Sequence, residues 1–166
     1  GALDNNTTLN ASLVTDDRKA GLTIYGQNRM RDAYDHDGDG FVEIPVIKSQ
    51  TIGTQAYIKT SAYSKLSLEY HATKEYRRGG DQLDVPPHQA YVAETTDHII
   101  NSGGITFEGT TADTRHRYSV YVSAQDVKRD SYYGSYMDPN AYGYTHGFTA
   151  VGGAQYMYRM PKFLFL

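Results

Sequence analysis

Residues 65–72 read Lys-Leu-Ser-Leu-Glu-Tyr-His-Ala, with an apolar or aromatic side chain at every second position. Because successive side chains of a β-strand point to opposite sides, this alternation is typical of a strand with one apolar and one polar face. The same period of two recurs along the chain, and no window shows the i, i+3, i+4, i+7 spacing of an amphipathic helix. The pattern predicts an all-β protein.

Composition supports this fold class and excludes several functions. The 166 residues suit a single domain, and 16 Tyr with 16 Gly favour strands joined by turns. A net charge of -3 provides no basic field for nucleic acid, and the absence of Cys excludes disulfides and thiolate metal sites. The mean hydropathy of -0.59 fits a soluble domain or a membrane β-barrel equally well.

The spacing of the alternating stretches predicts strands joined by connections of two lengths. We expect seven strands, near 8–15, 20–29, 48–60, 64–76, 98–109, 116–128 and 147–159, with a further stub at 163–166. The short connections are 16–19, 61–63, 111–115 and 161–162, and the long ones are 30–47, 77–97 and 129–146. Outer-membrane barrels combine short turns at one end with long loops at the other. The sequence therefore predicts an antiparallel up-and-down meander, part of a transmembrane β-barrel, with the three long loops at one end.

The alternation also assigns side chains to the two faces of the expected sheet. The face predicted to meet lipid carries Leu66, Leu68, Val120, Val122, Phe148 and Ala150. The face predicted to line the lumen carries Lys65, Glu69, Ser119 and Gln125. Tyrosines near strand ends suit an aromatic girdle at the membrane interface; they are Tyr25, Tyr57, Tyr70, Tyr118 and Tyr158.

The first long connection contains a candidate calcium site. Asp35, Asp37 and Asp39 occupy alternate positions with Gly between them, as do the first side-chain ligands of a calcium-binding loop. The carbonyl of Phe41 and the carboxylate of Glu43 are further candidate ligands. The twelfth position, where an EF-hand has its bidentate Glu, is Val46. The alternative interpretation is an acidic, solvated turn that binds nothing.

The other two long connections contain candidate ligand-binding residues. Arg77 and Arg78 precede two glycines and could present guanidinium groups to an anion. Tyr132, Tyr133 and Tyr136 could stack on planar or sugar-like ligands. The alternative is a surface of solvated charges. No His-x-x-x-His pair, nucleophile elbow or phosphate-binding glycine loop before a helix is present, so we expect no enzymatic activity.

Several of these stretches together resemble one family. Residues 32–45, 76–81, 85–88 and 124–134 look like the barrel of TonB-dependent outer-membrane receptors from the Bacteroidetes. The resemblance covers almost the whole chain and implies a 22-stranded barrel in the bacterial outer membrane with an N-terminal plug domain. It further implies TonB-powered uptake of a scarce, bulky nutrient, with the cobalamin and ferric-siderophore receptors as the most similar group. The partners implied are outer-membrane lipid, TonB, the plug domain, the small-molecule nutrient and a surface lipoprotein.

Two other interpretations remain open from the sequence. Only seven or eight strands are expected, without a plug domain or a TonB box, so the resemblance makes the chain a segment of such a receptor. Eight strands can also close a small barrel, which would give a structural or adhesive membrane protein. The third alternative is a soluble β-sandwich that binds glycans or other ligands through its Tyr-rich loops.

Overall fold

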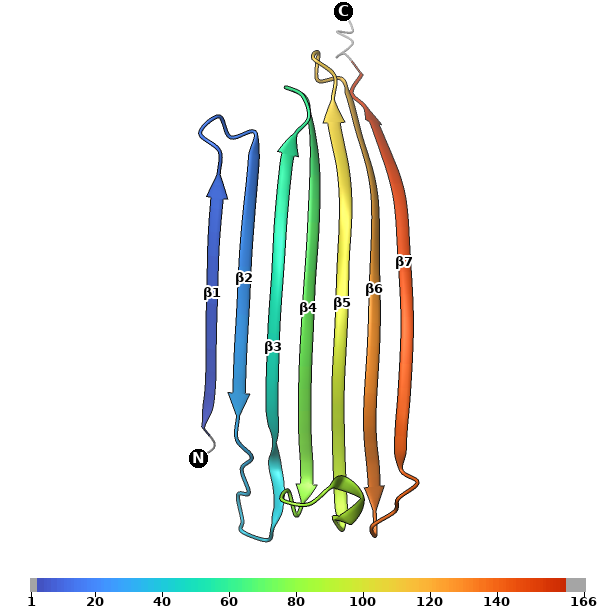
Figure 1. Cartoon of the computed structure of the whole chain (residues 1–166). Coiled ribbons are helices and arrows are strands. Elements are labelled where there is room, and N and C mark those ends of the chain that lie inside the picture. Colours follow the sequence, from blue (N-terminus) through green and yellow to red (C-terminus); the bar gives the residue numbers. More distant parts are fainter. Residues whose placement is uncertain (1–2, 161–166) are drawn as a thin grey trace, which may run out of the picture.

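The computed structural model describes residues 3–160, which form one antiparallel sheet (Figure 1). Its strands are β1 (Asp4–Val14), β2 (Ala20–Arg31), β3 (Phe41–Lys59), β4 (Ser64–Asp81), β5 (Val92–Thr110), β6 (His116–Ser135) and β7 (Tyr142–Tyr158). A single 3-10 turn, η1 (Pro87–Gln89), lies between β4 and β5. Each strand pairs with its sequence neighbours in the order β1 to β7, which confirms the up-and-down meander. The sheet is open, with β1 and β7 at its edges.

The short turns lie at one end of the sheet and the longer loops at the other, as predicted (Figure 1). We call these the turn end and the loop end. The predicted starts of β2, β4 and β6 are confirmed at the turn end, but the predicted bounds at the loop end are wrong. The loops are only 32–40, 82–91 and 136–141, because the strands continue for several residues past the predicted limits. The predicted stub at 163–166 lies outside the described residues.

The strands extend because backbone ladders do not require apolar side chains. Residues 77–80 pair with 93–96, although their sequence is Arg-Arg-Gly-Gly and lacks alternation. In β3 the pairing is interrupted between Val42 and Val46, on either side of Pro45, which has no N–H to contribute to a ladder. The Pro45 carbonyl instead accepts hydrogen bonds from the Arg31 guanidinium, at 3.2 and 3.3 Å.

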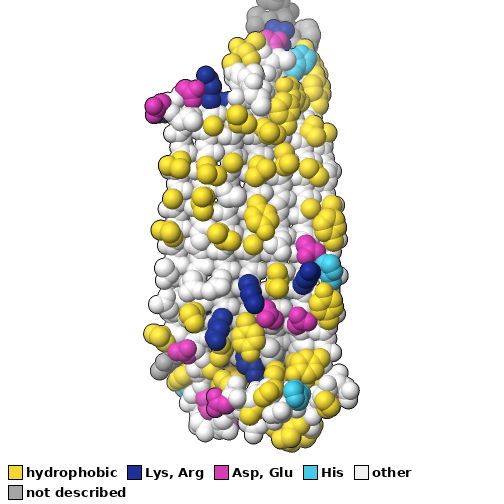
Figure 2. Space-filling view, in the orientation of Figure 1, with side chains coloured by type: hydrophobic (Ala, Val, Ile, Leu, Met, Phe, Trp, Pro, Cys, Tyr) yellow, Lys and Arg dark blue, Asp and Glu magenta, His cyan; other side chains and the backbone are white. Residues whose placement is uncertain are grey.

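One face of the sheet carries a continuous apolar band in the half nearer the turn end (Figure 2). Residues directly opposite each other across strands share a face, so the register defines rows. One row contains Ile58, Leu66, Phe107, Val120 and Ala154, and the next contains Leu22, Ala56, Leu68, Ile105 and Val122. The apolar band is made of these two rows and of neighbouring apolar residues on the same face, which include Ile24, Ile52, Tyr70, Phe148, Ala150 and Tyr156. Most of its side chains are exposed, with Val120 54% and Phe148 68% accessible, and Ala56, Leu66 and Phe107 are half-buried.

The apolar band ends abruptly toward the loop end. Along β6, the band residues Tyr118, Val120, Val122 and Ala124 are followed on the same face by Asp126, Lys128 and Asp130. Figure 2 shows the resulting charged zone between the apolar band and the loops. On β6 the apolar zone thus gives way to a charged zone between Ala124 and Asp126, two neighbouring residues of the same face.

The opposite face is polar. It carries Lys65, Glu69, Ser119 and Gln125, so the two sets of residues predicted for opposite faces do lie on opposite faces. Its side chains bond across strands: the Thr51 and Thr73 hydroxyls lie 2.9 Å apart, and the Ser102 hydroxyl lies 2.6 Å from His71 Nε2.

The polar face also holds two tyrosines that the sequence assigned to the girdle. Tyr25 is directly opposite Gly53 and Tyr57 is directly opposite Gly21, and each ring occupies the space where a side chain of that glycine would lie. The girdle prediction is therefore wrong for Tyr25 and Tyr57, because large rings on this face cover glycines of the neighbouring strand.

The best-buried cluster lies at the loop end and not in the middle of the sheet. Ala90, Ala93 and Tyr132 are buried there, with Val85 and Ala141 packed against them. The cluster joins β5 and β6 to the loop that contains η1. Over residues 3–160, no helix is long and apolar enough to span a membrane.

Candidate functional site: the loop end of the sheet

The loop between β2 and β3 brings its three aspartates together. One carboxylate oxygen from each of Asp35, Asp37 and Asp39 lies within 4.8 Å of the others. The backbone reaches this arrangement through Gly38 and Gly40, whose φ angles of +78° and +90° are in the region that favours glycine. The Asp35 carboxylate accepts hydrogen bonds from the N–H of Gly38 (2.6 Å) and of Gly40 (2.8 Å), which lower its pKa from 3.8.

The two remaining candidate ligands, Phe41 and Glu43, belong to the first residues of β3. The Phe41 N–H donates to Asp39 Oδ1 (2.8 Å), and Glu43 Oε2 accepts from the His36 N–H (2.7 Å), so Glu43 is directed back into the loop. A set of clustered carboxylate oxygens with a glycine at the sixth position fits a hard cation such as calcium. Val46, in place of the twelfth-position Glu, makes this ligand set weaker than that of an EF-hand.

The two candidate arginines are separated by the sheet. Arg77 and Arg78 are neighbours in β4, not in a loop as predicted, so their side chains lie on opposite faces. The Arg78 side chain is buried, at 3% accessibility, and donates to the carbonyls of Gly79 (2.9 Å) and Asp81 (3.3 Å). Arg77 donates to Glu75 Oε1 (2.7 Å) on the polar face. The structure therefore does not bring the two guanidinium groups together.

The three candidate tyrosines have different surroundings. Tyr132 is in β6, at 1% accessibility, and its hydroxyl donates to the Asp138 carbonyl (2.9 Å). Tyr133 is also in β6, not in the predicted loop, and its side chain is 59% accessible on the polar face. Tyr136 is exposed in the loop and lies edge-on to Tyr91, with ring centroids 4.8 Å apart.

Two of the predicted residues, Arg77 and Tyr133, line the same open pocket, which has a volume of about 380 Å³ and lies on the polar face near the loop end. Its polar lining further includes Glu75, Glu94, His98 and Arg129. His98 and Arg129 are directly opposite each other in β5 and β6. Glu94, His98 and Arg129 were not among the residues predicted from the sequence. Extending the β5–β6 register outward from the short turn at 111–115 would have placed His98 and Arg129 side by side.

Comparisons with protein families, with curated proteins and with solved structures found no match for this chain.

Proposed function

We propose that the chain forms part of the wall of an outer-membrane β-barrel. The observation that carries the proposal is the exposed apolar band on one face of a meander whose other face is polar. On β7 this face holds only apolar, aromatic or Gly residues from Phe148 to Tyr158. That is about 33 Å of strand at 3.3 Å per residue, and about 25 Å of height at a tilt near 40°. On β7 this height is that of the lipid-facing band of outer-membrane barrels, whereas on β6 the apolar residues of the same face run only from Tyr118 to Ala124, which is about 20 Å of strand and about 15 Å of height.

The barrel belongs, on this proposal, to a receptor of the TonB-dependent class that takes up a scarce, bulky nutrient such as cobalamin or a ferric siderophore. In the full-length receptor, TonB and a plug domain are partners of the barrel, and a surface lipoprotein assists capture of the nutrient. Further strands of the barrel pair with the free edges of β1 and β7. The pocket that contains Arg77, Tyr133 and Arg129 supports a ligand site, because it lies on the polar face near the loops. A two-sheet sandwich is disfavoured because nothing in residues 3–160 covers the apolar band.

The membrane proposal can be tested with single tryptophans, since the chain contains none. Val120→Trp should give a blue-shifted emission that lipids with brominated acyl chains quench, because this side chain would contact the bilayer core. Ser119→Trp, one residue away on the polar face, is the matched control and should not be quenched. Equal quenching of the two tryptophans in reconstituted vesicles would contradict the face assignment.

The nutrient can be tested with the full-length receptor. Equilibrium dialysis should show retention of cyanocobalamin or of a ferric siderophore. Arg129→Gln should weaken that retention about tenfold, since hydrogen bonds to a charged group contribute roughly 1.5–3 kcal/mol. Lys128→Gln, on the neighbouring residue and the opposite face, should leave retention unchanged. Retention of neither compound class would contradict the proposed substrates.

Calcium has a structural role in this proposal. The ion would be held by Asp35, Asp37 and Asp39, with the Phe41 carbonyl and Glu43 completing the ligand set, and it would relieve the repulsion between the carboxylates. The loop would then be ordered beside the ligand pocket. We expect a dissociation constant of roughly 10⁻⁴–10⁻³ M, as in extracellular modules.

Calorimetric titration of the receptor with calcium measures this binding. The Asp37→Ala, Asp39→Ala variant should lose the binding heat. The Asp16→Ala, Asp84→Ala variant removes the same charge outside the loop and should keep it. If the two variants and the unmodified receptor release the same heat, the aspartates share no calcium ion.

A further inference from the structure

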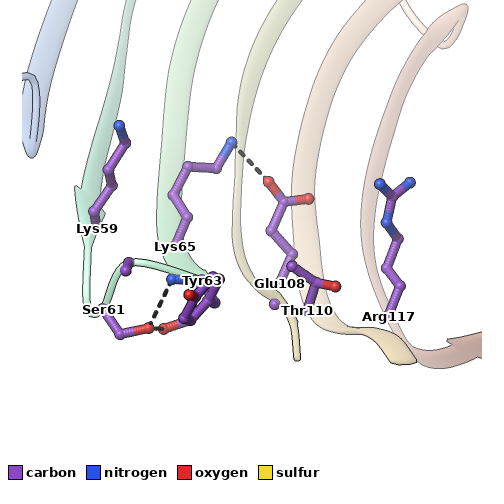
Figure 3. Close-up of a pocket in the computed structure, with 10 residues that line it drawn as sticks. Lys59, Ser61, Tyr63, Lys65, Glu108, Thr110 and Arg117 are labelled. Atoms are coloured by element: carbon purple, nitrogen blue, oxygen red, sulfur yellow. Dashed lines mark hydrogen bonds and ion pairs between the residues drawn. The ribbon is translucent and has the colours of Figure 1, made fainter. Parts of the chain in front are cut away.

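A group of basic side chains lies on the polar face at the turn end, far from the acidic loop (Figure 3). Lys59 of β3, Lys65 of β4 and Arg117 of β6 project to the same side of the sheet, together with Glu108 of β5. We call the three cations the basic row, although Arg117 is displaced by two residues from the row that joins Lys59, Lys65 and Glu108. Lys65 Nζ lies 2.7 Å from Glu108 Oε1. Within residues 3–160, Lys59 and Arg117 have no carboxylate within 4.0 Å.

Two other cations of the turn end are paired within their own turns. Lys19 pairs with Asp17 at 3.0 Å, and Arg115 pairs with Asp113 at 3.8 Å, each within its own turn. The basic row differs, because its three cations share one carboxylate. Lys59 and Lys65 are also directly opposite each other, an arrangement that destabilises a sheet when the charges are alike. An anion beside Lys59 would remove this repulsion.

The surroundings of the basic row suit a polar, anionic ligand. The row lines an open pocket of about 410 Å³, whose other walls include Ser61, Ser64 and Thr110. The Ser61 and Ser64 hydroxyls lie 2.7 Å from each other, and the Thr110 hydroxyl donates to the His116 carbonyl at 2.9 Å, so the cations provide the main attraction for an anion. With three cations and one anion, the charged lining has a net charge of +2 when the lysines are protonated.

The spacing of the cations indicates the shape of the ligand. Neighbouring strands lie about 4.8 Å apart, so the step from β3 to β6 spreads the basic row over roughly 14 Å. A single phosphate ion is too small to reach both Lys59 and Arg117. In an extended polypeptide, the side chains of one face follow each other about every 6.7 Å. Three carboxylates at successive positions of that face would therefore span this distance.

We propose that the basic row binds an acidic polypeptide segment that crosses the strands at the turn end of the polar face. Carboxylates of the segment pair with Lys59 and Arg117, while Lys65 remains bonded to Glu108. This inference goes beyond the proposed transport function and depends only on the sheet and its faces. It holds whether or not the apolar band contacts lipid.

The probe is a dye-labelled decapeptide with Glu at alternate positions, and its partner peptide has Gln at those positions. Fluorescence anisotropy with the full chain in zwitterionic detergent at low salt should show binding of the Glu peptide only. The Lys59→Gln, Arg117→Gln variant should bind it about tenfold more weakly, as expected for the loss of two exposed ion pairs. The control Lys74→Gln, Lys128→Gln removes the same charge from exposed lysines of the opposite face and should change binding less than twofold.

Two results would overturn the inference. The first is equal binding of the Glu and Gln peptides, or equal weakening by the two double variants, since either would show that the basic row is not the binding site. The second is displacement of the peptide by inorganic phosphate when chloride at the same ionic strength does not displace it. This result would indicate a site for a single small oxyanion. A failure of lipid quenching at Val120→Trp would leave the peptide result intact, so the two proposals can fail separately.

Discussion

Arginine at Val120 should destabilise the chain in a lipid bilayer by about 2–4 kcal/mol, the cost of a cation on the lipid face near the midplane. Val120 lies within the apolar band, and its neighbours across the strands are Phe107 and Ala154. No carboxylate of the described residues occupies that row. An arginine there would have to bend its side chain along the strand to reach water.

The neighbouring Ser119→Arg variant is the matched control. Ser119 lies on the polar face between Glu108 and Gln155, so an arginine there has a carboxylate directly opposite. We expect a much smaller change in the free energy of unfolding, measured by urea titration in vesicles of a neutral lipid. If both arginine variants lost equal stability, the two faces would not differ in solvent. If neither did, the apolar band would not lie in lipid.

Tyr132→Ala should cost about 3–5 kcal/mol, the range for removal of a large buried ring. Tyr132 contacts the buried Ala90 and Ala93 cluster and lies edge-on to Tyr142, with ring centroids 4.9 Å apart. Its loss would release loop 82–91 and loop 136–141 from the sheet. Because this cluster is at the loop end, we expect the change mainly as local opening, seen as faster hydrogen exchange in those two loops.

Two substitutions separate the contributions to this effect. Tyr132→Phe keeps the ring and removes only the hydrogen bond to the Asp138 carbonyl, so it should cost about 1 kcal/mol. Tyr133→Ala removes the adjacent, largely exposed ring and should leave the exchange rates of both loops nearly unchanged. Equal exchange in Tyr132→Ala and Tyr133→Ala would show that the buried ring does not hold the loops.

The sequence was informative wherever one face of the sheet is apolar and the other polar. Alternation in 64–72 and 118–124 located β4 and β6, their faces and their turn-end limits, because an apolar band requires an apolar residue at every second position. Alternation stops at the edge of this band, but backbone hydrogen bonding does not. The loop-end limits of the strands were therefore predicted several residues too early.

The same cause explains the result for the candidate site. Asp35, Asp37 and Asp39 were grouped correctly because a local turn brings them together, and local spacing can be read from the sequence. Arg77 and Arg78 were expected side by side in a loop, but a continuing strand sends them to opposite faces. The pairing of His98 with Arg129 depends on strand register over a long sequence separation, so no local motif indicates it.

Nearest-neighbour pairing of all strands has a consequence for how this sheet is assembled. Each new strand needs only the strand before it as a template, so the growing sheet closes one short loop at a time, beginning at the turns 15–19, 60–63 and 111–115. Closing a short turn costs little chain entropy, and each further pair of a hairpin then forms beside a pair that is already in place. At each stage one leading edge with free N–H and C=O groups is exposed. Addition can thus proceed in the order of synthesis, hairpin by hairpin, without rearrangement of the strands already in place.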